Sequence, residues 1–160
     1  MKYTVLAAAL ALAAPALADD TVALPSLGSG LGVDLAQAAV AACAADGYNV
    51  AAAVTDRSGI LLALVRAENA GAHTADAATA KAYTSASSRN PTSGMAKTVA
   101  ENPAAAGLVH IPGFLVLAGG VPVKAGKATI GAIGVGGAPG GQFDEACAMK
   151  ALETHAKRLK

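Results

Sequence analysis

The sequence predicts an α+β domain with one antiparallel sheet of about five strands. Strand-like segments fall into two groups, near residues 50–65 and 114–137, and only short turns separate the strands within each group. Short turns join antiparallel neighbours, whereas parallel strands need long crossovers. Helical patterns precede, separate and follow the two groups, which gives the order α-β-β-α-α-β-β-β-α.

The N-terminal part of the expected domain is a helix followed by a β-hairpin. Residues 34–46 show helical periodicity, with Leu35, Ala39 and Ala42 on one stripe and Gly47 as a stop. Strands near residues 50–54 and 60–65 flank the turn sequence at residues 56–59. Both faces of this hairpin are apolar, so helices or another subunit should cover both.

The C-terminal part adds two helices, three strands and a last helix. Thr74 is a good N-cap for a helix that runs to about Ser87, and a shorter helix occupies about 93–101, between two Asn-Pro pairs. Strands are expected at residues 114–118, 121–124 and 128–137. The last helix begins beyond Gly141 and runs to the C-terminus.

The first eighteen residues have the pattern of a secretory signal peptide. Lys2 precedes an uncharged apolar run from Val5 to Leu17, and small residues end at Ala18 just before two aspartates. Cleavage after Ala18 would leave a single domain, residues 19–160, in the periplasm or outside the cell. No later segment is long and apolar enough for a transmembrane span.

The composition argues against a nucleic-acid partner and for self-association. Twelve basic and eleven acidic residues give a net charge of +1, and no basic face is evident. The chain is rich in Ala and Gly, whose small side chains bury little area each. We therefore expect a homo-oligomer, which would bury further surface between subunits.

Two cysteines, Cys43 and Cys147, leave two interpretations open. An exported chain can form a disulfide between them. Each also lies in an Ala-rich helical pattern, where a free cysteine behaves as a small buried apolar residue.

A glycine-rich segment at residues 131–141 resembles a phosphate-binding loop at first sight. Its spacing fits neither the dinucleotide fingerprint nor the P-loop, because Pro139 stands at the sixth position of the former and Gln142 follows the last glycine of the latter. Asp144 and Glu145 then fall in the first turn of the next helix, where they would repel a phosphate. We interpret the segment as a tight strand-to-helix junction.

His73 is the candidate metal-binding side chain. It precedes the expected helix start, and a neutral imidazole there could bind a metal ion. Lys81 and Thr84 continue along the same helix, and Arg66 ends the strand before it. An imidazole with cations in reach suits a haem, whose propionates pair with Arg or Lys. The alternative is a surface histidine that hydrogen-bonds its own loop.

Three other side chains have weaker claims. His110, expected in a loop before a strand, is the second candidate for an axial ligand. Tyr83 suits a packed core, although tyrosinate can bind ferric iron. His155 is expected on the solvated face of the last helix.

Three ordered segments resemble the GlcG/HbpS family of haem-binding proteins, which is related to the C-terminal domain of PduO-type proteins. They are VTDRSGILLALVRAENAGAHTADAATAKAYTSA at residues 54–86, GGVPV at 119–123 and IGAIGVGGAPGGQFDEACA at 130–148. The resemblance implies a three-layer α/β/α domain, dimers to octamers, haem binding and, in some members, oxidative haem degradation. Its motif-matching positions include the five residues Arg66, His73, Lys81, Tyr83 and Thr84.

Three functions follow as hypotheses. The first is an exported, oligomeric haem-binding protein that scavenges, stores or senses haem, with His73 on the iron and Arg66 or Lys81 near the propionates. The second is an enzyme or accessory protein that acts on a small organic acid or a corrinoid. The third is a structural or interaction module of the cell envelope.

Overall fold

The computed structural model describes residues 22–160, so the expected signal peptide lies outside the described residues. One four-stranded sheet forms the centre, in the order β2-β1-β4-β3 with antiparallel neighbours throughout. The elements are α1 (Ser29–Ala45), β1 (Ala51–Asp56), β2 (Leu61–Arg66), α2 (His73–Ser88), α3 (Thr92–Glu101), the 3-10 helix η1 (Pro103–His110), β3 (Gly120–Ala125), β4 (Ala128–Gly136), α4 (Gly141–Thr154) and the short 3-10 helix η2 (Ala156–Arg158).

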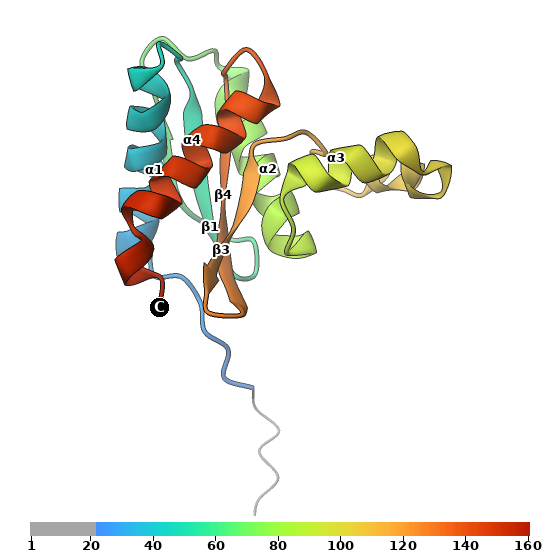
Figure 1. Cartoon of the computed structure of the whole chain (residues 1–160), viewed down its shortest axis with the longest axis horizontal. Helices are drawn as coiled ribbons and strands as arrows, with labels where there is room; N and C mark the ends of the chain where they lie inside the picture. The colour runs from blue at the N-terminus through green and yellow to red at the C-terminus, as the bar shows by residue number, and fades with distance from the viewer. Residues whose placement is uncertain (1–21) are drawn as a thin grey trace, which may run out of the picture.

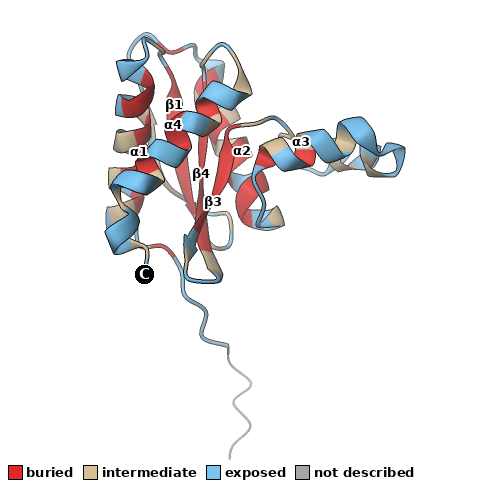
Figure 2. Cartoon of the chain, viewed as in Figure 1, coloured by how far each residue is buried: buried red, intermediate tan, exposed pale blue. Residues whose placement is uncertain are grey.

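Helices cover both faces of the sheet, which confirms the expected three-layer α/β/α arrangement. Helices α1 and α4 lie side by side on one face, and α2 lies on the other (Figure 1). The main core fills the space between the sheet and the α1–α4 layer, and strands β1, β3 and β4 are buried along most of their length (Figure 2). Its largest fully buried side chains are Leu35, Ile133, Val50, Val54, Val123 and Val135.

Small residues bring α2 very close to the sheet. Ala51 and Ala53 of β1 meet Ala78 and Ala82 of α2 in a core made only of alanines. At Gly134 of β4, a Cβ atom would collide with the carbonyl oxygen of Ala78. The richness in Ala and Gly therefore has a packing reason within one chain, namely the short distance between helix and strand.

The expected strand at residues 114–118 is wrong, so the sheet has four strands instead of about five. This segment is irregular and partly exposed. The backbone N–H of Leu115 is bound by the hydroxyl of Thr84 on α2, at 2.8 Å, and the N–H of Leu117 turns back to the carbonyl of Leu115 at 2.9 Å. Backbone groups that bond in this way cannot form a ladder with a neighbouring strand.

The start of α2 also differs from the expectation. The helix begins at His73, its N-cap position is Ala72, and no side chain caps it. Thr74 is inside the helix and donates its hydroxyl hydrogen to the carbonyl oxygen of Gly71 at 2.7 Å. His73 is thus the first residue of the helix and not a loop residue.

A disulfide bond joins Cys43 of α1 to Cys147 of α4, with Cα atoms 5.4 Å apart. Both cysteines also belong to the main core, so the bond ties together the two helices on one face of the sheet. Of the two interpretations that the sequence left open, a disulfide or two free buried cysteines, the structure has the disulfide.

Helix α3 and η1 extend away from the sheet as an arm (Figure 1). None of the η1 residues is buried, and α3 buries only Thr92 and Met95. Across residues 22–160, no helix combines the length and apolar character needed to cross a membrane.

Candidate functional site

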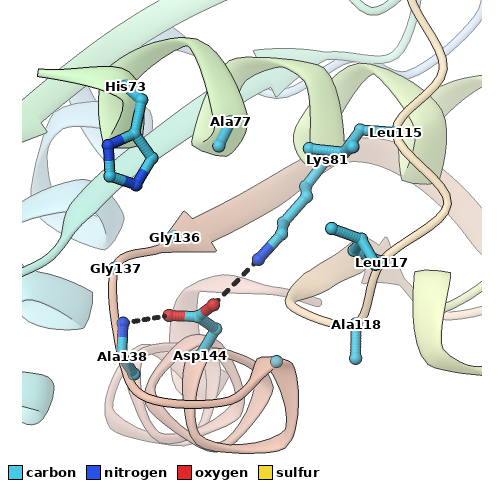
Figure 3. Close-up of a pocket in the computed structure, with 11 residues that line it drawn as sticks. His73, Ala77, Lys81, Leu115, Leu117, Ala118, Gly136, Gly137, Ala138 and Asp144 are labelled. Atoms are coloured by element: carbon cyan, nitrogen blue, oxygen red, sulfur yellow. Dashed lines mark hydrogen bonds and ion pairs between the residues drawn. The ribbon is translucent and has the colours of Figure 1, made fainter.

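A pocket of about 480 Å³ lies where α2, the β4–α4 junction and the irregular segment before β3 meet (Figure 3). Its size falls within the range of small-molecule sites, and most of its lining is apolar or glycine. The lining residues are His73, Ala77, Lys81, Leu115, Leu117, Ala118, Gly136, Gly137, Ala138, Gly141 and Asp144.

Helix α2 supplies one wall of the pocket through residues four positions apart. His73, Ala77 and Lys81 fall on the same helical face because residues at i and i+4 lie one above the other. The imidazole of His73 is exposed, whereas Lys81 is buried two turns further along. At 1.5 Å per residue, eight residues separate the two positions by about 12 Å along the helix axis. The wall therefore runs from an accessible imidazole to a buried ammonium group.

A buried ion pair between Lys81 and Asp144 forms the inner end of the pocket, since these two residues and Gly136 are the buried part of its lining (Figure 3). The Lys81 Nζ lies 2.8 Å from Asp144 Oδ2, and the two side chains are only 5% and 4% exposed. Lys81 also donates to the carbonyl oxygen of Val135 at 2.9 Å. Burying either charge alone would be costly, so the pair is stable only as a unit. It connects α2, the end of β4 and the first turn of α4.

The β4–α4 junction supplies the second wall. Asp144 Oδ1 accepts the backbone N–H of Ala138 at 3.0 Å, which holds the junction against α4. Gly137 has a φ of +128°, and a Cβ atom there would lie 2.7 Å from the carbonyl oxygen of Asn49. Gly137 thus serves a turn packed against the backbone, which agrees with the tight strand-to-helix junction expected from the sequence.

The third wall is the segment that carries Leu115 and Leu117, and α2 holds it in place. Besides the bond between Thr84 and Leu115, the ring of Tyr83 packs against Gly59 and Gly113, which lie in two different turns. Tyr83 also meets Phe114 edge to face, with ring centroids 6.0 Å apart. Thr84 and Tyr83 do not line the pocket themselves. They hold in place the segment that carries Leu115 and Leu117.

The predicted site residues separate into two groups. His73 and Lys81 line the same pocket, whereas Arg66, Tyr83, Thr84 and His110 are not among its lining residues. Arg66 turns to the backbone, where its guanidinium donates to the carbonyl oxygens of Ala70 and Glu68.

His110 and Tyr83 have other surroundings than expected. His110 is the exposed last residue of η1, on the arm. Tyr83, expected in the core, is 36% exposed at the surface of α2. Neither brings a polar atom to the pocket that holds His73.

Sequence reasoning missed the part that Asp144 takes in the pocket. The sequence pattern predicts Asp144 in the first turn of the last helix, where it does lie, but only as a charge that would repel a phosphate. Its pairing with Lys81 joins positions 63 residues apart. The sequence does contain a signal for this pair: Lys81 and Asp144 are opposite charges on otherwise apolar faces of two helices. Charged side chains are rarely buried unless they are paired.

No cluster of three or more His, Cys, Asp or Glu side chains suited to a metal ion occurs within residues 22–160. Residues 22–160 therefore contain no site at which side chains alone would surround a metal ion. A prosthetic group that brings its own equatorial ligands needs only one or two protein ligands.

Known proteins and structures place the chain in a family. The family model described as haem degrading protein HbpS-like matches residues 32–153. A double mutant of HbpS from Streptomyces reticuli is 39% identical, with a TM-score of 0.80, and the match covers 92% of this chain and 98% of that one. Among curated proteins, none matches significantly.

Two more distant crystal structures share the fold. Protein ORFY from Klebsiella pneumoniae is 23% identical with a TM-score of 0.82, over 88% of this chain and 97% of that one. A complex of PduOC with haem is 23% identical with a TM-score of 0.72, over 80% and 94% of the two chains. The three segments that resemble the GlcG/HbpS family, residues 54–86, 119–123 and 130–148, all lie within the range 32–153 that the family model matches. The chain belongs to the HbpS-like family.

Proposed function

We propose that this protein binds haem in the pocket between α2, the β4–α4 junction and the Leu115–Leu117 segment. The observation that carries the proposal is an accessible imidazole, His73, at the edge of a largely apolar pocket of about 480 Å³. The family description names haem degradation, and the fold is shared with a protein that is described in complex with haem.

The residues of the pocket suit such a group. Leu115, Leu117 and Ala77 offer apolar contacts to a flat macrocycle, and the glycines of the β4–α4 junction leave the opposite side free of side chains. His73 would be the axial ligand, since imidazole is a common ligand of haem iron. The bound haem would supply an iron centre for redox chemistry or for sensing, and the chain would supply its position and its shielding from water.

A haemin titration tests the proposal. The wild-type protein should give a shifted Soret band that saturates at a fixed ratio of haem to protein. His73→Ala should weaken binding at least tenfold, in line with the 10–100-fold effects typical of lost support for a metal ligand. His110→Ala is the matched control, because this exposed histidine lies on the arm and should leave the spectrum unchanged.

Equal spectra for the wild type and His73→Ala would overturn the ligand assignment. Loss of the band in His110→Ala alone would move the ligand to the arm. No saturable band in any of the three proteins would overturn haem binding itself.

The proposal includes a homo-oligomer, supported by the surface of β2. This strand lies at an edge of the sheet, and Ile60, Leu61 and Leu64 at or next to it are 65%, 45% and 42% exposed. Apart from Arg66 at its end, β2 carries no charge, and an apolar edge strand tends to find a partner. A mass several times that of one chain in light scattering would support the oligomer, and a monomeric mass would contradict it.

The proposal also includes export. The pattern of residues 1–18 supports it, and so does the Cys43–Cys147 disulfide, because such bonds persist mainly in oxidising compartments. Fractionation of cells that express the full chain should place the processed protein outside the cytoplasm, with Asp19 as its N-terminal residue. An unprocessed chain in the cytoplasmic fraction would contradict this part.

A further inference from the structure

We infer that the Lys81–Asp144 pair does not anchor a carboxylate of the bound molecule: the inner end of the pocket takes an uncharged group, and the charged groups of the ligand stay at the mouth beside His73. This inference rests on the proposed haem site and deepens it, because it fixes which edge of the macrocycle enters first. It also replaces the sequence-based hypothesis that Lys81 meets a haem propionate.

The charge of Lys81 is already neutralised. Its Nζ is 2.8 Å from Asp144 Oδ2, and both side chains are almost fully buried. A ligand carboxylate that approached Nζ would also approach the Asp144 carboxylate, so that attraction and repulsion would nearly cancel. The cost of removing the ligand carboxylate from water would remain. An anion therefore gains little at this end of the pocket.

Asp144 is not free to move aside for a ligand. Its second oxygen, Oδ1, accepts the backbone N–H of Ala138 at 3.0 Å. Releasing Lys81 would break the ion pair and leave a buried carboxylate without its counter-charge. The pair is consequently a fixed part of the pocket wall without net charge, and Lys81 is not available to pair with an anion of the ligand.

The protein itself already uses two of the three donors of the Lys81 ammonium group. An ammonium group has three N–H donors. Two of those of Lys81 donate to the carbonyl oxygen of Val135 and to Asp144 Oδ2. The backbone at Gly119 packs closely against the pair, because a Cβ atom at that position would lie 2.9 Å from Nζ and 2.7 Å from the carbonyl oxygen of Val135. A ligand carboxylate could therefore receive at most one hydrogen bond from this ammonium group.

The mouth is the end at which charged groups remain solvated. His73 lies there with an exposed side chain, about 12 Å from Lys81 along the helix. Leu117, which is 56% exposed, also lies at the open part of the pocket, whereas Ala77 and Leu115 are half-buried. A molecule with an apolar edge and an anionic edge is therefore oriented with its apolar edge inward.

Haemin and its dimethyl ester distinguish the two orientations in the wild-type, full-length protein. The ester keeps the iron and the macrocycle but carries no carboxylate. If the propionates remain in water at the mouth, the Soret titrations of the two compounds should give dissociation constants within about threefold of each other. A propionate bound to a buried ammonium group would instead make the ester weaker by about tenfold or more, as expected for a lost charge-assisted hydrogen bond.

A ratio of tenfold or more overturns the inference and leaves haem binding standing. No saturable band with haemin overturns the proposed function, and the inference with it. A second comparison uses the charge-free double variant Lys81→Met with Asp144→Leu. The dissociation constant of the ester divided by that of haemin should be the same in this variant as in the wild type, and a quotient that falls about tenfold in the variant identifies Lys81 as a propionate anchor.

Discussion

The hydroxyl of Thr84 accepts the backbone N–H of Leu115 at 2.8 Å and donates to the carbonyl oxygen of Ala80 at the same distance. One side chain of α2 thereby fixes the wall of the pocket that faces α2 itself. The helix carries His73 and Lys81 two turns apart and also holds the segment of Leu115 and Leu117. The position of this wall relative to α2 is accordingly set by α2 and the hydrogen bond that it makes.

Replacement of Thr84 by Val should release this wall. Valine keeps the shape but leaves the N–H of Leu115 without its acceptor, which should lower the free energy of unfolding by about 1–3 kcal/mol. The amide hydrogen of Leu115 should exchange faster with solvent, and haemin should bind more weakly. Thr98→Val is the control, since Thr98 is exposed on α3 and bonds only to its own helix. Unchanged exchange at Leu115 in Thr84→Val would contradict the assignment.

The Lys81–Asp144 pair should behave as a buried unit in a mutant cycle. Asp144→Asn leaves the Lys81 ammonium buried without a counter-charge and should lower the free energy of unfolding by about 3–5 kcal/mol. The double variant Lys81→Met with Asp144→Leu should recover most of that loss, because it buries no charge.

A second ion pair offers the control for that cycle. Lys97 and Glu101 are 4.0 Å apart on α3, and their side chains are 73% and 66% exposed. Glu101→Gln should therefore change the free energy of unfolding by less than about 1 kcal/mol. Equal effects of Asp144→Asn and Glu101→Gln in urea unfolding would show that burial does not matter for the inner pair.

Loss of the disulfide should destabilise the fold strongly. Cys43 and Cys147 are 104 residues apart. Closing a loop of about 100 residues lowers the entropy of the unfolded chain and thereby raises the free energy of unfolding by about 4.7 kcal/mol in the chain-entropy model. Unfolding curves of the oxidised and the fully reduced wild-type protein should differ by an amount of that order. A thiol assay on the denatured, unreduced protein should find no free thiol, and two thiols per chain would contradict the bond.

Two glycine replacements should act in opposite directions. Gly134→Ala places a Cβ atom against the backbone of α2 and should cost at least about 3 kcal/mol, at the upper end of overpacking effects. Gly94→Ala, in α3, meets no atom within 4 Å and should stabilise the helix by up to about 1 kcal/mol. The two melting temperatures, measured against the wild type, should move apart; two decreases of equal size would contradict the close contact at Gly134.

The sequence was sufficient for most of the fold because the local patterns agree with the final contacts. Alternating apolar residues at 50–54 and 60–65 do form β1 and β2, and the helix stop at Gly47 is close to the observed end of α1 at Ala45. The segment 114–118 has a similar apolar run, but its backbone bonds go to the side chain of Thr84, 31 residues away. Local periodicity cannot reveal a partner at that distance, so the expected fifth strand was wrong.

The site was predictable only in part for the same reason. His73 and Lys81 lie on one helix, so their spacing alone places them in one pocket. Arg66 is near them in sequence, yet its guanidinium bonds to the loop that joins β2 to α2. Asp144 reaches Lys81 through the arrangement of three elements, and this contact depends on tertiary structure.

The disulfide has a consequence for a chain that has been cut. Every strand of the sheet, together with α2 and the arm, lies between Cys43 and Cys147. A protease that cleaves once anywhere in this ring, for example in the exposed arm, produces two pieces that stay covalently joined. The pocket walls contributed by α2, by β4 and by the start of α4 then remain parts of one molecule. If the protein is exported and binds haem as proposed, a cut molecule of this kind would keep its pocket together after damage that would divide a chain without this bond.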